Sequence, residues 1–212
     1  MEAVKDKLTL IELDKSLAQH WTSEGYRTFH TDALKFDWSG VPEGSILISN
    51  LPYQISSRLL IELFVKDHGL GTMVLMFQKE VGERIRALPE DKKTYGLLSI
   101  LCDLFWDVKP LVKVPGQCFF PQPEVESLVL TFEKKAFPDA VDKRDFVKHL
   151  KMLFASRRKK MGSSFKNLKN NMNQNLSQSL YQSLFNTMEL RPDSLSPKEH
   201  LDFYLKIKEM ES

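Results

Sequence analysis

Four consecutive residues, Asn50-Leu51-Pro52-Tyr53, combine groups suited to holding a planar base and its amino group. An exocyclic amine of a base is a poor nucleophile because its lone pair is delocalised into the ring. The Asn50 side-chain oxygen and the Leu51 backbone carbonyl can accept its two N–H bonds and draw the nitrogen toward tetrahedral geometry. Pro52 stiffens the turn, and Tyr53 offers an aromatic face for stacking. Taken alone, the pattern also fits an ordinary strand end followed by a proline turn.

The residues around this motif predict the carboxyl edge of a sheet. Residues 45–49 form a short apolar run typical of a buried strand, and residues 55–66 have apolar side chains at helical spacing. Further strands are predicted at similar apolar runs, 8–11, 26–30, 72–77, 105–112 and 127–132. Strands that alternate with helices indicate an α/β fold with a largely parallel sheet and helices on both faces, in which the last two strands can pair as antiparallel edge strands. Ligands bind where parallel strands end, so we expect Asn50 at the rim of a site.

The second half of the chain differs from the first in pattern and in charge. After residue 133 the apolar spacing is helical, over residues 144–155, 178–188 and 197–210. Residues 1–133 hold 14 Lys and Arg against 19 Asp and Glu, and residues 134–212 hold 16 against 9, so the net charges are −5 and +7. We therefore expect two domains, 1–133 and 134–212, the second binding a polyanion such as nucleic acid. A solvated basic helix face is the alternative.

The motifs follow one another in the order found in a known enzyme family. Residues 50–56, Asn-Leu-Pro-Tyr-Gln-Ile-Ser, resemble the amine-binding loop of the KsgA family of rRNA adenine dimethyltransferases, which use S-adenosylmethionine to dimethylate adenines of small-subunit rRNA. Seven further segments resemble the family's other motifs in order: 10–14, 31–34, 78–81, 95–99, 119–127, 154–159 and 190–196. The resemblance runs over almost the whole chain. It implies a doubly wound Rossmann-like methyltransferase sheet with a small C-terminal all-α domain.

For the target base, the resemblance implies that Asn50, Leu51, Pro52 and Tyr53 hold the adenine. Phe119 would close over the base opposite Tyr53. Without the resemblance, a core aromatic is the favoured interpretation of Phe119.

For the cofactor, the resemblance implies contacts from Glu12, Asp32, Ala33 and Asn50. Glu12 ends its predicted strand, where a carboxylate can bind both ribose hydroxyls. Asp32 would accept from the cofactor's adenine amine, with the Ala33 N–H beside it. From the residues alone, Glu12 is also an ordinary exposed strand-end residue, and Asp32 also fits a turn or a helix cap.

The basic segment Arg157-Arg158-Lys159-Lys160 follows an apolar helix and resembles the family's C-terminal basic motif. No acidic residue occurs between Asp145 and Glu189, and Lys166 and Lys169 extend the run of cations. Such a cluster can neutralise several phosphates and release their counterions. We expect it to bind small-subunit rRNA or the 30S precursor. Phosphate contacts position RNA without reading its sequence, so a splayed-out adenine would supply specificity.

The chain departs from the family pattern at its start. No G-x-G-x-G occurs among its 9 glycines, and the chain begins almost at the family's second strand. The resemblance places the family's first strand in the middle of the sheet, so we expect an incomplete sheet with open strand edges and weaker binding of S-adenosylmethionine. The chain is then a fragment, a natural short form, or one part of an assembly, and a homodimer would cover the gap.

Two other functions remain open from the sequence. One is a non-catalytic rRNA-binding or ribosome-assembly protein, which the absent glycine loop favours. The other is the related antibiotic-resistance methyltransferase of large-subunit rRNA. The segments 157–159 and 190–196 argue against it, because they resemble motifs of the small-subunit family.

Composition and cysteine usage exclude several classes of protein. The chain has 212 residues, of which 42% are hydrophobic and 27% charged, an ordinary globular balance that excludes fibrous or disordered chains. Two cysteines, Cys102 and Cys118, cannot form a disulfide framework, so we expect a reducing, cytoplasmic location. The five histidines show no ligand spacing, so we expect no metal, and we expect no membrane segment.

Overall fold

The computed structural model describes residues 5–138, 141–164 and 178–211. In its first part the elements are β1 (Thr9–Glu12), α2 (Lys15–Ser23), β2 (Arg27–His30), β3 (Ser45–Ser49), α3 (Tyr53–Val65), β4 (Leu70–Gln78), α4 (Lys79–Ile85), α5 (Leu97–Phe105), β5 (Trp106–Val114) and β6 (Ser127–Lys134). The helices α6 (Lys143–Ala155), α8 (Gln178–Met188) and α9 (Pro197–Glu211) follow. Lys166 and Lys169 of the predicted basic run lie outside the described residues.

The strands form two sheets, a parallel pair β1–β2 and a four-stranded sheet in the order β3-β4-β6-β5. β3 and β4 are parallel, and β6 is antiparallel to both β4 and β5. The α/β class with a C-terminal helical part is therefore confirmed, as is the antiparallel pairing of the last two strands. In the four-stranded sheet β3, β4 and β5 run in the same direction and β6 alone is reversed, so the sheet is largely parallel in strand direction. The expectation that both of the last two strands lie at the edge is wrong for β6, because the β5–β6 hairpin inserts it between β4 and β5.

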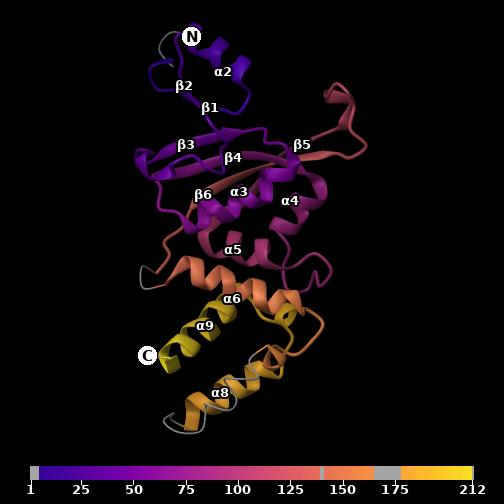
Figure 1. Ribbon diagram of the computed structural model, residues 1–212. Coiled ribbons are helices and arrows are strands. Elements are labelled where there is room, and N and C mark those ends of the chain that lie inside the picture. The colour runs from indigo at the N-terminus through magenta and orange to yellow at the C-terminus, as the bar shows by residue number, and fades with distance from the viewer. Residues whose placement is uncertain (1–4, 139–140, 165–177, 212) are drawn as a thin grey trace.

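A gap separates the two sheets where the incomplete sheet was expected. No hydrogen-bonded pairing joins β1 to β3 among the described residues. On the β3 edge, Ile46 and Ile48 are 65% and 76% exposed, which is unusual for branched apolar residues in a strand. Figure 1 shows the β1–α2–β2 unit set apart beyond β3. The open edge of β3 thus exposes backbone and apolar side chains together.

The helices cover only one face of the four-stranded sheet. On β4 the side chains of Met73, Leu75 and Phe77 are buried, and α3, α4 and α5 lie on one side of the sheet (Figure 1). The alternate residues Val74 and Met76 are only half-buried. The prediction of helices on both faces is wrong for the part of the chain that the structure describes, since this second face has no helix packed on it.

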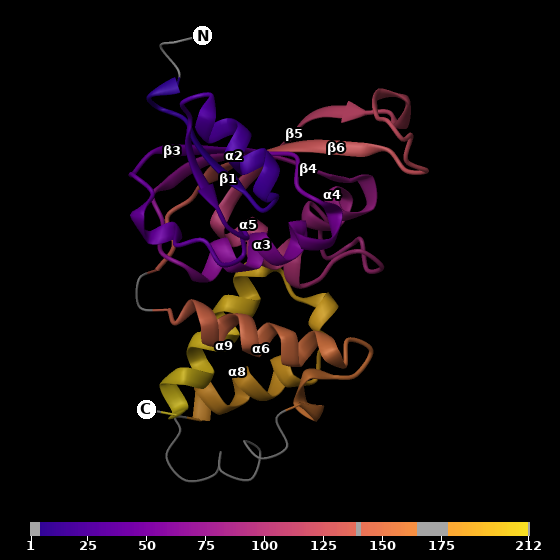
Figure 2. The same ribbon diagram turned by 45° about the horizontal axis from the view of Figure 1, so that its top comes forward.

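The C-terminal helices pack against the sheet's helical layer and share its core. Phe146 and Leu150 of α6 and Tyr204 of α9 belong to the same buried cluster as Leu63 of α3 and Ile100 of α5. A second cluster lies within the helical part, among Leu153, Met161, Leu184, Met188, Leu195, Phe203 and Ile207. Figure 2 shows α6, α8 and α9 gathered on one side of the sheet's helices. The division at residue 133 stays a prediction, because the two parts share one core.

Local sequence explains where these C-terminal helices begin. Asp142 accepts from the backbone N–H groups of Arg144 and Asp145 at 2.9 and 3.0 Å, which caps α6. The Ser196 Oγ accepts from the Glu199 N–H at 3.3 Å, and the Glu199 carboxylate accepts from the Ser196 N–H at 2.7 Å. This reciprocal capping box confirms the predicted start of α9. In the described ranges no helix is long and apolar enough to cross a membrane.

Candidate functional site

The loop at residues 50–53 lies between the carboxyl end of β3 and the start of α3, as predicted. Asn50 is exposed, and no described group forms a hydrogen bond with its side-chain amide. Leu51 is 9% exposed and packs into the main core, which anchors the loop. Pro52 precedes the first helical residue without a side-chain cap, so the first turn of α3 keeps free N–H groups. The loop therefore presents a fixed backbone and a free amide.

Tyr53 is tied to a distant segment of the chain by its hydroxyl group. The Tyr53 Oη and the Ser127 Oγ are 2.9 Å apart, and Ser127 is 1% exposed. Ser127 is the first residue of β6 and directly follows the loop that contains Phe119. The hydrogen bond therefore joins the two segments that are predicted to hold the base. Ser127 ends the predicted motif 119–127, but its position eight residues after Phe119 gives no signal of this contact.

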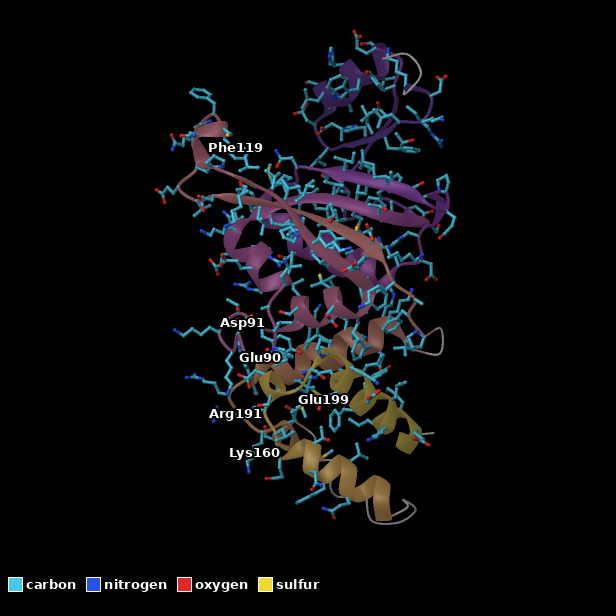
Figure 3. All side chains as sticks on the ribbon, turned by 180° about the vertical axis from the view of Figure 1, so that it is seen from behind. Glu90, Asp91, Phe119, Lys160, Arg191 and Glu199 are labelled. Atoms are coloured by element: carbon cyan, nitrogen blue, oxygen red, sulfur yellow. The ribbon has the colours of Figure 1, made fainter. Side chains whose placement is uncertain are left out.

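Phe119, labelled in Figure 3, lies in the loop at the end of the β5–β6 hairpin. Its backbone is extended, its N–H donates to the Gly116 carbonyl at 3.1 Å, and its side chain is half-buried. Gly116 is required by close packing, because a Cβ there would lie 2.8 Å from the Pro123 carbonyl oxygen. Among the described residues no ring contact joins Phe119 to Tyr53, so the predicted closure over the base stays a prediction.

Three of the predicted cofactor residues lie at the carboxyl ends of β1 and β2: Glu12 is the last residue of β1, and Asp32 and Ala33 follow β2. The Glu12 Oε1 accepts from the Asp14 N–H at 2.8 Å, and the Asp32 Oδ1 accepts from the Leu34 N–H at 2.9 Å. Asp32 thus forms a turn, one of the two interpretations that the sequence left open. Each carboxylate keeps one oxygen without a described partner, so each can still accept from a hydroxyl or an amine. The Ala33 carbonyl accepts from the Trp38 Nε1 at 3.1 Å, which fixes this turn against the core.

A hollow of about 290 Å³ lies beside β1, and Glu12 forms part of its wall. Its other lining residues are apolar or aromatic: Leu8, Leu10, Ile11, Trp21 and Tyr26. Asp32, Ala33 and Asn50 do not line it, and Asn50 follows β3, which belongs to the other sheet. The structure therefore brings Glu12 to a hollow but does not gather the four predicted cofactor residues in one pocket.

The four predicted RNA-binding cations divide into two pairs. Arg157 is half-buried, donates to the Lys93 carbonyl at 3.1 Å, and lies 3.5 Å from the Asp193 carboxylate. Lys160 donates to the Glu189 carboxylate at 2.6 Å. Arg158 and Lys159 are exposed, and no described carboxylate pairs with them. Arg157 therefore joins the two parts of the chain, and Arg158 and Lys159 are the cations most open to a phosphate.

One edge of the molecule carries both the Phe119 loop and the basic segment. Figure 3 shows Phe119, Asp91, Arg191 and Lys160 along the same side. The Arg157–Lys93 contact brings the exposed residues Lys92 and Lys93 beside the basic segment. A nucleic-acid strand bound by these cations would run toward the hairpin loop that contains Phe119.

Several buried titratable groups lie away from these loops. Tyr95 donates its hydroxyl proton to the Leu195 carbonyl at 2.7 Å, and burial raises its pKa. Burial raises the pKa of the Cys102 thiol to about 12, so this cysteine is a neutral core residue. Arg84 and Glu80, four residues apart on α4, form a surface ion pair at 2.9 Å. No three potential metal ligands gather within the described ranges.

Comparison with known proteins decides the family. A sequence model described as "Ribosomal RNA adenine dimethylase" matches residues 1–204. The chain belongs to this family. The "Ribosomal RNA small subunit methyltransferase A" of Bdellovibrio bacteriovorus is 40% identical over 154 residues, which cover 72% of this chain and 56% of the relative. The protein of the same name from Syntrophotalea carbinolica is 39% identical over 165 residues, 74% of this chain and 62% of the relative.

Solved structures support the fold. A dimethyladenosine transferase from Plasmodium falciparum aligns with 95% of this chain and 82% of its own, at 24% identity and a TM-score of 0.74. The 23S rRNA methyltransferase ErmE aligns with 94% and 81% at 14% identity and a TM-score of 0.61. The chain spans about three fifths of the length of the curated relatives named above.

Proposed function

We propose that this protein takes part in methyl transfer from S-adenosylmethionine to the exocyclic amine of adenines in small-subunit rRNA. The observation that carries the proposal is the Tyr53–Ser127 hydrogen bond, which fixes the 50–53 loop against the segment that bears Phe119. Membership of the rRNA adenine dimethylase family supports the reaction class.

The chain's own groups would act on the adenine as follows. The Asn50 side-chain oxygen and the Leu51 carbonyl accept the two amine N–H bonds and aim the nitrogen lone pair. Tyr53 stacks on the base, and Phe119 covers its other face. When bound, S-adenosylmethionine would supply an electrophilic methyl group carried on a sulfonium, and the neutral thioether would be the leaving group. The alkylated amine then loses its proton to water, so no side-chain base of matched pKa is needed.

The cofactor would be held by groups that already fit it chemically. One free oxygen of Glu12 can accept from ribose hydroxyls, and one free oxygen of Asp32 can accept from an adenine amine. The gap between β1 and β3 leaves this side of the site incomplete in the described residues. We propose that binding of S-adenosylmethionine to this chain alone is weak, and that a homodimer covers the open β3 edge.

The proposed substrate particle is the 30S precursor, in the cytoplasm. The test is transfer of labelled methyl groups to 30S particles, with Asn50→Ala beside the wild-type chain. We expect this substitution to lower the rate about 100-fold, because a misplaced amine loses its alignment. The matched control Asn186→Ala removes an exposed amide on α8 and should leave the rate unchanged. Equal rates for both variants would contradict the role of Asn50.

A second function is favoured by the gap between the sheets. If Glu12 and Asn50 do not face one cofactor, the chain would bind rRNA without transferring methyl groups, as a ribosome-assembly protein. Binding to 30S particles without incorporation of label would support this function. Preferential labelling of 50S particles would instead favour the large-subunit methyltransferase.

A further inference from the structure

Phe120 is the most exposed large apolar side chain of the described residues, with a relative exposure of 102%. It follows Phe119 at the end of the β5–β6 hairpin. Other exposed apolar side chains of the same arm are Leu111, Val112 and Val125, at 60%, 49% and 44%. Figure 2 shows the arm reaching beyond the rest of the sheet. A cluster of exposed apolar groups on a projecting arm marks a contact surface.

The backbone directs Phe119 and Phe120 to different sides. Phe119 has φ −119° and ψ 152°, an extended conformation in which successive side chains point to opposite faces. Phe119 is accordingly half-buried and Phe120 fully exposed. Consecutive Cα atoms lie about 3.8 Å apart, so the two rings can meet neighbouring nucleotides of one strand.

The charges of the arm favour a base over a phosphate as the partner of Phe120. Glu126 pairs with Lys79 at 2.9 Å, and Lys109 pairs with Asp107 at 2.7 Å. The opposite charges of Glu124 and Lys113 cancel, so the net charge of the arm is close to zero. The cations lie instead at the other end of the same edge, around Lys160 and Arg191 (Figure 3). A single strand anchored there would meet aromatic rings, not charges, when it reaches the arm.

We propose that Phe120 stacks on a base next to the target adenine and so selects the nucleotide context of the modified site. This inference rests on the proposed function and extends it, because it assigns a second base-binding ring that faces away from the target. Unpaired bases are recognised by stacking on aromatic side chains, and the nucleotides that flank a flipped base commonly set substrate choice.

The test uses the full chain and single-stranded 12-nucleotide RNAs that contain one adenine among uridines. The fluorescent base 2-aminopurine replaces either the adenine or one of its two neighbours. We expect Phe120→Ala to weaken binding about 5- to 100-fold and to abolish the fluorescence change at one neighbour, and to leave the change at the adenine position. Phe120→Trp should restore both, because it restores an aromatic face.

Leu111→Ala is the matched control, since it removes another exposed apolar side chain of the same arm. If this control weakens binding as much as Phe120→Ala, the arm is a general apolar surface and the inference is overturned. Unchanged binding of Phe120→Ala to the RNA overturns it as well. If Phe120→Ala instead lowers self-association in sedimentation, the arm contacts a second copy, and stacking on a base is refuted.

Failure of the proposed function would look different. In that case the wild-type chain would transfer no labelled methyl group to 30S particles, whatever effect Phe120→Ala has on binding of the RNAs. Binding by the wild type with no effect of Phe120→Ala would remove only the present inference.

Discussion

The hydrogen bond between Tyr53 and Ser127 gives a sharp test, because its two hydroxyl groups differ in burial. Ser127 is 1% exposed and Tyr53 is half-buried. Tyr53→Phe leaves the Ser127 hydroxyl buried without a partner, which costs about 1–3 kcal/mol of unfolding free energy. Ser127→Ala leaves the Tyr53 hydroxyl close to solvent, where water can replace the lost partner. We therefore expect Tyr53→Phe to destabilise the chain more than Ser127→Ala.

The double variant completes the cycle. With both hydroxyls removed, no polar group is left unpaired, so the loss should be smaller than the sum of the single losses by about 1 kcal/mol. Urea unfolding measures each value; for a slope of about 2 kcal/mol per molar, a 1.5 kcal/mol loss moves the midpoint by roughly 0.75 M. Additive losses within about 0.3 kcal/mol, or a larger loss for Ser127→Ala than for Tyr53→Phe, would refute the reasoning.

Three further predictions concern charge, pH and packing. Arg157→Ala should lower the free energy of unfolding by about 1 kcal/mol in urea, because Arg157 joins Lys93 to Asp193. Arg158→Ala should leave stability unchanged but weaken RNA binding and make its salt dependence shallower. The reverse pattern would contradict the division of these cations. Burial lowers the pKa of His200 to about 4, and the Nε2 donates to the Pro192 carbonyl at 2.8 Å while the Nδ1 is buried without a described partner. Because the folded pKa lies below the ordinary value, stability should be complete above about pH 6.5 and fall as the pH drops toward 4, by about 3 kcal/mol. Urea melts at pH 7 and pH 5 should differ by about 2 kcal/mol of this fall, and a His200→Gln variant with the same slope would contradict it. Gly116→Ala should displace the loop and weaken RNA binding as Phe119→Ala does; Gly40→Ala, where a Cβ meets nothing within 4 Å, is the control.

Local sequence predicted the helices and strands and the position of Asn50 between them, because both depend on neighbouring residues in the chain. The apolar run at 45–49 and the helical spacing that follows placed Asn50 at a strand end. The start of α9 at residue 197 was predicted in the same way, and its capping contact agrees with it. The contacts that organise the site could not be read in this way. Ser127 meets Tyr53 across 74 residues, and Arg157 meets Lys93 across 64, so both depend on tertiary packing.

Strand order was the other limit of sequence reasoning. A hydrophobic run does not specify whether its neighbours are parallel, so the insertion of β6 between β4 and β5 was not foreseen. The ion pairs of the basic segment could not be predicted either. Residues 157–160 are all cations, yet only two of them form ion pairs with Asp193 and Glu189.

The gap between the sheets also divides the molecule into units of unequal cooperativity. In the described part of residues 5–30, Ile11 packs against the main core and Phe29 contacts Phe36 beside it. Because so few apolar contacts hold it, the β1–α2–β2 unit can open while the rest stays folded. Its backbone amides should exchange with solvent well before those of β4 and β6. A ligand that touches both Glu12 and Asn50 would bridge the two units and slow that exchange in proportion to its occupancy. Amide exchange in β1 would then report cofactor binding directly, independently of whether a methyl group is transferred.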